Sequence, residues 1–364
     1  MTFKDGELVR QLLERVKVFS VELLLPLTCG GVGSKPWREI MTAKWILTAV
    51  FILTQPQFSL AQKLLLAHVA INPGQGMLHL AKDSGILAKY GFSAEVILIP
   101  GTPRTIQALI AGDLDYVLAG APASLRARAQ GADVTILSTL SSYSSQRVFV
   151  RPDSTLTSFN DLKGKIIGVT QYGSGGDTFL RAALRKSGIK ESDVTILQMG
   201  GTPGVAQGLE SGRIEVGVLG DSGLLLVFRG RAKPLKGASA REMGFRGTDA
   251  PLTTMERKIK NDRAGVVRFM QAYLETVRFF QTNKQGTARI LKKYMGGVSE
   301  EDISLWCDEL RAILKPIPYA DEEALRAELE MMNPPGLQIP AGYINNSILD
   351  ELKKNGFIDK LFKQ

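Results

Sequence analysis

Histidine and cysteine are scarce in this sequence of 364 residues, which contains two of each. His68, His79, Cys29 and Cys307 show no zinc-ligand spacing, and no Cys–His pairing or Gly-x-Ser-x-Gly elbow is present. No Gly-Lys-Ser or Gly-Lys-Thr is present either, which excludes a nucleotide P-loop. The sequence therefore predicts no metal site, no cofactor and no catalytic residue, and we expect that the protein is not an enzyme.

A long hydrophobic run is also missing, because no apolar stretch reaches the roughly 20 residues that a membrane-spanning helix needs. The stretch MTAKWILTAVFILTQPQFSLAQ, which begins at Met41, has instead a basic lead with Lys44, a short apolar run and a small-residue site ending at Ala61. This is the order of a secretory signal. We predict a signal peptide over residues 41–61 and interpret residues 1–40 as an upstream extension before the true start at Met41.

Two other interpretations of the N-terminal region stay open. Residues 41–61 could form a buried core helix. Alternatively, residues 18–28 could be the export signal and Cys29 a lipid-anchored cysteine, although Glu22 and Pro26 interrupt that apolar run.

Clusters of basic residues are absent as well. Lys and Arg outnumber Asp and Glu by 45 to 36, a net charge of +9, but they are dispersed, with no arginine-rich tract and no interleaved aromatic residues. We therefore expect no binding to nucleic acid. Cleavage after Ala61 would leave Cys307 as the single cysteine, so we expect no intramolecular disulfide.

Short apolar segments alternate with helix-length segments as far as residue 219, which predicts an α/β protein. We expect strands at residues 63–70, 94–99, 114–119, 134–137, 148–151, 166–169, 194–198 and 214–219. These strands are too apolar to have a solvent-exposed face, so they predict mainly parallel sheets covered by helices on both sides. The rhythm stops after residue 264, and helices are expected at residues 264–281, 286–294, 300–314 and 320–332.

An internal repeat is the most specific feature of the sequence. GTPRTIQALIAGDLDYVLAG, residues 101–120, matches GTPGVAQGLESGRIEVGVLG, residues 201–220, at seven of twenty positions. Each copy predicts a helix that starts at Gly-Thr-Pro, a glycine at its end, an acidic residue and a strand. An offset of this length indicates two similar α/β domains rather than a solenoid. Coincidence between two ordinary βαβ units is the alternative.

Several segments of the chain resemble the substrate-binding proteins of ABC importers, in the branch of the taurine, alkanesulfonate, nitrate and thiamine-pyrimidine-precursor binders. They are NPGQGMLHLAKDSGILAKYGF, AGDLDYVLAG with APAS behind it, SFNDLKGKIIGV with a glycine-rich helix start, and SGRIEVGVLGDSG. The resemblance implies a type II periplasmic-binding fold, in which two lobes close about a hinge on a solute and deliver it to a permease. The related thiamine-pyrimidine synthases are enzymes, but this sequence lacks their cysteine-rich motif.

From this resemblance we expect lobe I to comprise residues 62–143 and 245–364, and lobe II residues 144–244. The partners it implies are a small-molecule solute and the permease and ATPase subunits of an ABC importer. We expect a periplasmic monomer. A ligand sensor that contacts a signalling receptor is the alternative function, and an enzyme like the thiamine-pyrimidine synthases is a further one.

Ligands of open parallel sheets bind beyond the carboxyl ends of the strands, where helix N-termini present free N–H groups. Four loops and the crossing between the lobes fit this position. Asn72 and Gln75 offer amides, Ser124 a hydroxyl, and the glycine-rich helix start at residues 173–178 a cradle for an anion. Asp221 would suit an amine or hydroxyl of the ligand, or cap the next helix.

The candidate ligand-binding residues are Asn72, Gln75, Gly120, Ala121, Ser124, Ser142, Tyr143, Tyr172, Gly173, Ser174, Gly175 and Asp221. Because helix starts dominate this set and no acidic cluster offsets them, we expect a solute with an anionic or strongly hydrogen-bond-accepting group.

Overall fold

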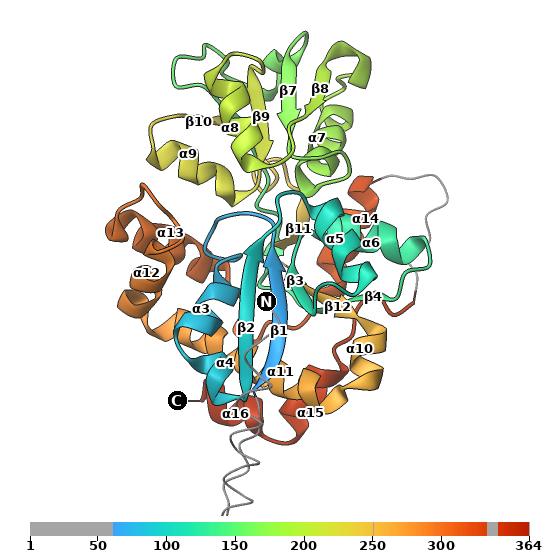
Figure 1. The fold of residues 1–364 in the computed structure, drawn as a ribbon. Coiled ribbons are helices and arrows are strands. Elements are labelled where there is room, and N and C mark those ends of the chain that lie inside the picture. The colour runs from blue at the N-terminus through green and yellow to red at the C-terminus, as the bar shows by residue number, and fades with distance from the viewer. Residues whose placement is uncertain (1–60, 250, 333–340, 364) are drawn as a thin grey trace, which may run out of the picture. The chain divides into compact units, whose positions relative to one another are not determined.

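The computed structural model describes residues 61–249, 251–332 and 341–363 (Figure 1). The predicted extension at residues 1–40 and all of the predicted signal peptide except Ala61 lie outside the described residues. By their contacts, residues 60–364 make one compact unit. The assignment of residues to two lobes therefore stays a prediction, although the strands of this unit form two separate large sheets.

The first sheet has five strands in the order β2-β1-β3-β12-β4. Their bounds are β1 Gln62–His68, β2 Phe92–Leu98, β3 Tyr116–Leu118, β4 Val134–Ser138 and β12 Leu252–Met255. β1 is parallel to β2 and β3, while β12 runs antiparallel between β3 and β4. Figure 1 shows α5 and α6 on one side of this sheet and α3 and α4 on the other.

The second sheet also has five strands, in the order β10-β6-β9-β7-β8. Their bounds are β6 Arg147–Val150, β7 Ile166–Val169, β8 Thr195–Gln198, β9 Val216–Leu219 and β10 Lys233–Ser239. β7 is parallel to β8 and β9, whereas β6 is antiparallel to both β9 and β10.

The chain crosses between the two sheets twice. As predicted, most strands of each sheet run in the same direction, and the exceptions are β12 in the first sheet and β6 in the second. A short two-stranded sheet of β5, Ser141–Tyr143, and β11, Arg246–Asp249, lies at the crossings. After β5 the chain enters the second sheet through β6, and after β11 it returns to the first through β12. A strand that arrives from the other sheet is not preceded by a helical crossover, so it can pair antiparallel. Both sheets are consequently mixed.

The predicted helices after residue 264 are confirmed within one or two residues, and two further helices follow them. The helices are α3 Met77–Asp83, α4 Ile86–Lys89, α5 Thr102–Ala111, α6 Ala121–Ala129, α7 Gly175–Lys186, α8 Thr202–Glu210, α9 Leu224–Phe228, α10 Glu256–Asn261, α11 Arg263–Thr282, α12 Lys284–Lys292, α13 Glu300–Ile313, α14 Glu322–Met332, α15 Ser347–Lys354 and α16 Phe357–Phe362. Three short 3₁₀ turns lie at Phe159–Leu162, Glu191–Asp193 and Asp221–Gly223.

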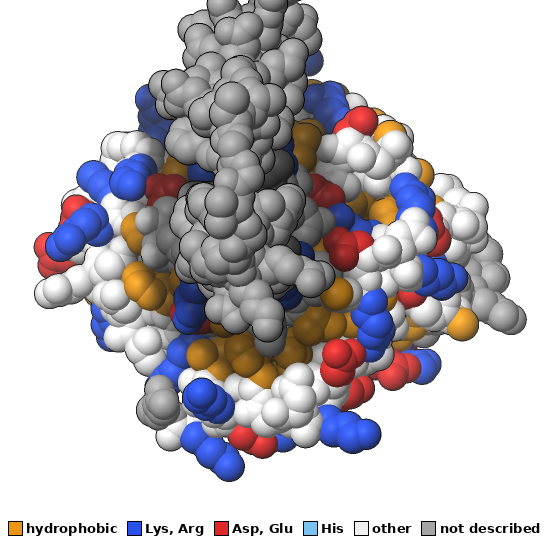
Figure 2. All heavy atoms as spheres, turned by 60° about the horizontal axis from the view of Figure 1, so that its bottom comes forward, with side chains coloured by type: hydrophobic (Ala, Val, Ile, Leu, Met, Phe, Trp, Pro, Cys, Tyr) orange, Lys and Arg blue, Asp and Glu red, His pale blue; other side chains and the backbone are white. Residues whose placement is uncertain are grey.

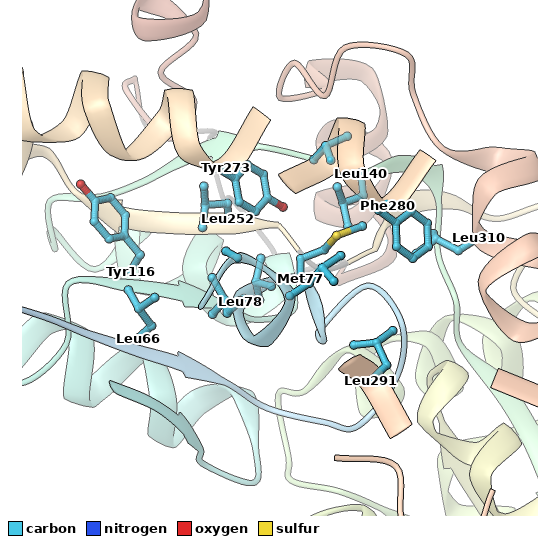
Figure 3. Close-up of a cluster of buried hydrophobic side chains, with 14 of the residues drawn as sticks. Leu66, Met77, Leu78, Tyr116, Leu140, Leu252, Tyr273, Phe280, Leu291 and Leu310 are labelled. Atoms are coloured by element: carbon cyan, nitrogen blue, oxygen red, sulfur yellow. The ribbon is translucent and has the colours of Figure 1, made fainter. Parts of the chain in front are cut away.

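The core beside the first sheet is built around α11. The ring of Phe269 on this helix stacks on Tyr116 of β3, with 3.7 Å between the ring centroids. Figure 3 shows Tyr273 beside Leu252 of β12, and Phe280 beside Leu140 and Leu310. Burial of this apolar surface fixes the helical C-terminal part against the sheet. α14 differs, because it packs against both α6 and α7.

The internal repeat reappears as a structural equivalence. α5 leads into β3 and α8 leads into β9, and each of these strands lies at the centre of its sheet. Asp115 Oδ2 accepts a hydrogen bond of 2.7 Å from the backbone N–H of Leu65 on β1. Glu215 Oε1 accepts one of 3.4 Å from the backbone N–H of Ile166, at the start of β7. Because both acids tie a repeat to the neighbouring parallel strand, coincidence is the weaker interpretation.

Charged side chains of both signs are scattered over the face of the molecule in Figure 2 rather than gathered by sign. Across residues 61–249, 251–332 and 341–363, the structure has no helix with the length and apolar character needed to cross a membrane.

Candidate functional site

A small polar pocket lies where the two sheets approach each other, and we call it the inner pocket. It has a volume of about 80 Å³ and receives residues from both sides of the two crossings. Among the side chains that line it are those of Asn72, Gln75, Gln146, Ser174, Thr248 and Asp249. The carboxyl end of β1 and the loops after β3, β7 and β9 meet here, as expected for ligand sites of open α/β sheets.

Four helices begin at the inner pocket. The lining includes Thr102 at the start of α5, Gly120 before α6, Gly175 at the start of α7 and Thr202 at the start of α8. The first-turn N–H groups of α5, α6 and α8 donate no capping bond to an N-cap side chain, because the N-cap residue is glycine in each case. Proline follows within the first turn of these three helices and fixes their entry. The pocket thus collects the positive ends of four helix dipoles.

The amides of Asn72 and Gln75 also line the inner pocket, and both are buried. Asn72 Oδ1 accepts a 2.7 Å bond from the backbone N–H of Gln75. Gln75 Oε1 accepts a 3.2 Å bond from the backbone N–H of Val69. These bonds hold the amide oxygens, which leaves the amide nitrogens as donors for a solute.

Asp249 is the one charged residue among the described residues that line the inner pocket. It is 7% exposed, and its Oδ1 accepts a 3.0 Å bond from the hydroxyl of Ser145. Ser145 lies just after β5 and Asp249 at the end of β11, so this bond joins the two crossings of the chain. A buried carboxylate in this position can recognise a hydrogen-bond donor.

Five of the twelve predicted ligand-binding residues meet at the inner pocket: Asn72, Gln75, Gly120, Ser174 and Gly175. Ser174 also caps α7, because its hydroxyl accepts a 3.4 Å bond from the backbone N–H of Asp177. Ala121 and Ser124 are buried in α6, and neither lines this pocket. The Ser124 hydroxyl has no hydrogen-bond partner among the described residues.

The other predicted residues have local roles. Ser142 donates a hydrogen bond to Asp321, and Gly173 donates its N–H to Asp177 at 2.8 Å. Tyr172 is half exposed, and its hydroxyl donates a 3.0 Å bond to the backbone carbonyl of Ile196. Tyr172 therefore packs along β8.

Asp221 lies outside the inner pocket, in a second cavity of about 630 Å³ that Tyr143 also lines. Its carboxylate is 3.2 Å from Arg147, which is itself 3.9 Å from Glu309 on α13. Burial and, to a lesser extent, the charge of Asp249 raise the pKa of Asp221 to about 7, while Arg147 acts in the opposite direction. In the structure Asp221 forms an ion pair with Arg147, and the amine-binding role considered from the sequence stays a prediction.

Residues at the crossings were missed by sequence reasoning. The inner pocket also receives side chains from the crossings, because β5 and β11 lie side by side; these are Ser145, Gln146, Thr248 and Asp249. No local sequence pattern predicts that pairing. Thr102 and Thr202 also line the pocket, and their hydroxyls occupy equivalent positions of the repeat. The Gly-Thr-Pro signal of the repeat could have identified those two.

Comparison with known proteins identifies the family to which most of the chain matches. A family model described as NMT1/THI5 like matches residues 72–285. A curated Brucella abortus relative, named as a binding protein, is 36% identical over 126 residues, which cover 35% of this chain and 38% of the relative. The aligned part thus spans less than two fifths of the length of the curated relatives.

Solved structures share the fold over a larger part of the chain. The alkanesulfonate-binding protein of Xanthomonas axonopodis, solved with MOPS, is 20% identical with a TM-score of 0.65, over 78% of this chain and 98% of that one. The periplasmic nitrate-binding protein of Synechocystis is 14% identical with a TM-score of 0.67, over 83% and 91%. A Candida albicans protein described as having the generic periplasmic binding protein fold is 14% identical with a TM-score of 0.61, over 80% and 95%. The predicted fold class is confirmed.

Proposed function

This chain belongs to the NMT1/THI5-like family, and we propose that it is an extracytoplasmic solute-binding protein that delivers a small organic molecule to an ABC importer. The observation that carries the proposal is the inner pocket, where four helix N-termini from two similar α/β halves converge. Three of the relatives named above are described as binding proteins, and two of these are described by the anions that they bind.

The solute in this proposal presents an anionic or strongly hydrogen-bond-accepting group to the inner pocket. Uncapped N–H groups at the starts of α5, α6 and α8 supply donors without any positively charged side chain. The amide nitrogens of Asn72 and Gln75 add two more donors. A solute whose acceptor satisfies these donors is favoured over one that leaves them unpaired.

A second requirement on the solute comes from Asp249. A solute group that contacts this buried carboxylate must donate a hydrogen bond, because a second acceptor there would repel it. The solute therefore carries an amine or hydroxyl in addition to its acceptor group. This transfers to Asp249 the role that the sequence suggested for Asp221.

Capture requires the two lobes to close, and contacts between elements of the two sheets support such a movement. Arg126 on α6 donates 2.6 Å and 3.2 Å bonds to the carbonyl of Gly173 and the hydroxyl of Thr178, beside the start of α7. Arg185 on α7 donates a 2.6 Å bond to the carbonyl of Met331 on α14. The short β5–β11 pair serves as the hinge in this proposal.

Export through a signal peptide at residues 41–61, a periplasmic location, a monomeric state and contact with permease and ATPase subunits complete the proposal. The family and the fold support these features, as the solved relatives include periplasmic proteins. N-terminal sequencing of the exported protein tests the signal directly: a mature N-terminus at Gln62 supports it, and one at Cys29 contradicts it.

A thermal-shift screen tests the proposed solute. The library pairs each sulfonate, carboxylate and pyrimidine with a neutral analogue that lacks the acceptor. A true ligand at a hundred times its dissociation constant stabilises the folded state by about 2.7 kcal/mol, which moves the melting temperature visibly. If only cationic compounds raise the melting temperature, the proposed chemistry of the inner pocket is wrong.

Small-angle scattering then tests capture with a ligand found in the screen. Closure of the lobes reduces the radius of gyration when the protein is saturated. An Arg126→Ala variant loses the bonds to Gly173 and Thr178, so we expect it to need a higher ligand concentration for the same reduction. An unchanged radius at saturation of the unmodified protein would contradict capture by closure.

A further inference from the structure

The inner pocket is too small for a whole organic solute. Its volume of about 80 Å³ is well below the roughly 300 Å³ at which pockets for small organic ligands begin. A solute whose polar group fills the inner pocket must therefore extend beyond it.

A second pocket continues from the inner one, and we call it the outer pocket. It has a volume of about 260 Å³ and shares Val69, Ala70 and Thr202 with the inner pocket. Ile71, Leu98 and Pro100 line it from the side of the first sheet. Apolar residues of α8 and α9 line it from the side of the second, among them Pro203, Ala206, Leu225 and Leu226.

The walls of the outer pocket are apolar, and its charges have protein partners. Arg231 pairs with Glu210 at 3.1 Å, and Arg229 donates a hydrogen bond to the carbonyl of Gly296. Leu98 is 40% exposed, one of the few large hydrophobic side chains exposed in the described part of the chain. An apolar group placed against Leu98 would cover this surface.

We propose that the outer pocket binds the apolar body of the solute whose polar group occupies the inner pocket. This inference rests on the proposed function, and it narrows the solute to an elongated molecule with a polar head and an apolar segment of several carbons. Leu98 and the facing residues of α8 and α9 then select for the size of that segment.

Calorimetric titration of straight-chain sulfonates and carboxylates of increasing length, from one to eight carbons, tests the proposal. We expect roughly three- to fourfold tighter binding for each added methylene until the pocket is filled. The binding heat capacity should become more negative along the series, because apolar surface is buried. Phenyl-bearing acids added to the series probe the width of the pocket.

A matched pair of variants tests whether the gain in affinity with chain length arises in the outer pocket. Leu98→Ser should weaken binding of the longest members by about tenfold and leave the one-carbon members unchanged. Leu305→Ser is the control, because Leu305 on α13 is 58% exposed and does not line the outer pocket. Leu305→Ser should change neither the affinity for the longest acids nor the affinity for the one-carbon acids.

Two results separate failure of this inference from failure of the proposed function. If short acids bind and added methylenes give no gain, or if Leu98→Ser and Leu305→Ser act alike, the outer pocket does not take part and the inference is overturned alone. If no acid of any length binds, while neutral or cationic compounds do, the proposed chemistry of the inner pocket fails and the inference fails with it.

Discussion

Gly101 lies directly against the side-chain amide of Gln171, although one residue precedes α5 of the first sheet and the other follows β7 of the second. A methyl group on Gly101 would overlap this amide. Gly201, the equivalent residue in the second repeat, lies against Pro100 in the same manner, and a methyl group there would come within 2.6 Å of the Pro100 Cβ. The repeated glycine thus allows each half to approach the other.

Gly101→Ala should therefore weaken solute binding by about tenfold or more, because the added methyl group obstructs the closed arrangement. Part of any effect would come from backbone strain, since Gly101 has a φ of 94°. Gly112→Ala controls for that strain, because Gly112 has a φ of 90° and no neighbouring atom within 4 Å of an added methyl group. Titration of both variants with one ligand makes the comparison.

A second substitution makes the test of Gly101 specific. Gln171→Ala should restore much of the affinity in the Gly101→Ala background, since it removes the amide that the methyl group meets. Equal losses in Gly101→Ala and Gly112→Ala would mean that strain alone is responsible.

The acidic residues of the repeat should differ in their contribution to stability. Asp115 bonds the Leu65 N–H at 2.7 Å and pairs with Lys258 at 2.6 Å, and its side chain is 26% exposed. Glu215 has a longer bond of 3.4 Å to Ile166, and its side chain is 43% exposed. Asp115→Ala should lower the free energy of unfolding by about 1–3 kcal/mol and Glu215→Ala by less than about 1 kcal/mol. Urea denaturation measures both, and the reverse order would refute this account.

The helices and strands that could be predicted from the sequence are those determined by neighbouring residues in the chain. The Gly-Thr-Pro helix starts, the acid before each central strand and the apolar strands are encoded by neighbouring residues, and all are found in the structure. The four missed strands, β5, β10, β11 and β12, are short or polar, and three of them lie at or beside the crossings between the sheets. Their pairing depends on residues about a hundred positions apart, for example Tyr143 with Arg246.

The residues of the candidate site likewise divide into those that a local sequence pattern indicates and those that depend on pairing between distant strands. Asn72, Gly120 and Ser174 line the inner pocket and follow a local pattern, because Gly120 and Ser174 each come after a strand and cap a helix, and Asn72 lies in the loop after β1. Asp249 was missed because its place in the inner pocket follows from the pairing of β11 with β5. Asp221 lies outside the inner pocket because a position in the repeat does not determine the direction of a side chain, and its carboxylate pairs with Arg147 of β6 in the larger cavity.

His68 and His79 form a buried pair with 2.9 Å between their Nε2 atoms. His68 Nδ1 lies 2.8 Å from the carbonyl of Ala70 and must donate to it, so His68 Nε2 is the acceptor of the pair and His79 Nε2 the donor. Protonation of His68 would set an N–H on its Nε2 against the N–H of His79, whereas a second proton on His79 would go to its buried Nδ1, which has no hydrogen-bond partner among the described residues. Burial lowers the pKa of both, and the neighbouring histidine helps to lower that of His79 to about 4.

Stability should therefore fall as the pH is lowered from about 6.5 to about 4, because the unfolded chain binds protons that the folded pair excludes. We expect His79 to contribute roughly 2 kcal/mol to this loss. The rings of His79 and Tyr294 stack with 3.6 Å between their centroids. His79→Phe keeps a ring in this position and removes the titrating group. Its urea midpoint should depend less on pH over this interval than that of the unmodified protein. An identical dependence would show that the pair does not resist protonation.

Glu328 should give a pH dependence of the opposite sign. Its Oε1 accepts bonds of 2.7 Å and 3.2 Å from the N–H and hydroxyl of Thr248, while its buried Oε2 has no hydrogen-bond partner among the described residues. Burial raises the pKa of Glu328 to about 7. A raised pKa means that its stabilising contribution is complete below the unfolded value of about 4.5 and is lost as the pH rises through about 7.

Glu328→Gln keeps the acceptor for Thr248 without the charge. It should match the unmodified protein near pH 4 and exceed it by roughly 2–4 kcal/mol at pH 8.5, measured by urea denaturation. A variant that is less stable than the unmodified protein at pH 8.5 would show that the carboxylate is stabilised in its charged form.

We expect substitution of the two aspartates near the crossings to affect solute binding differently. Asp249 lines the inner pocket, whereas Asp221 faces the larger cavity and pairs with Arg147. Asp249→Asn keeps an oxygen for the Ser145 hydroxyl and removes the charge, so it should weaken a solute with an amine by at least about tenfold, the cost of a charge-assisted bond. An analogue without the amine should bind the variant as well as it binds the unmodified protein.

Asp221→Asn should leave both affinities unchanged, because the carboxylate of Asp221 does not reach the inner pocket. If Asp221→Asn instead lowers the affinity for the amine and Asp249→Asn does not, the solute lies in the larger cavity, and the role first suggested for Asp221 is the right one.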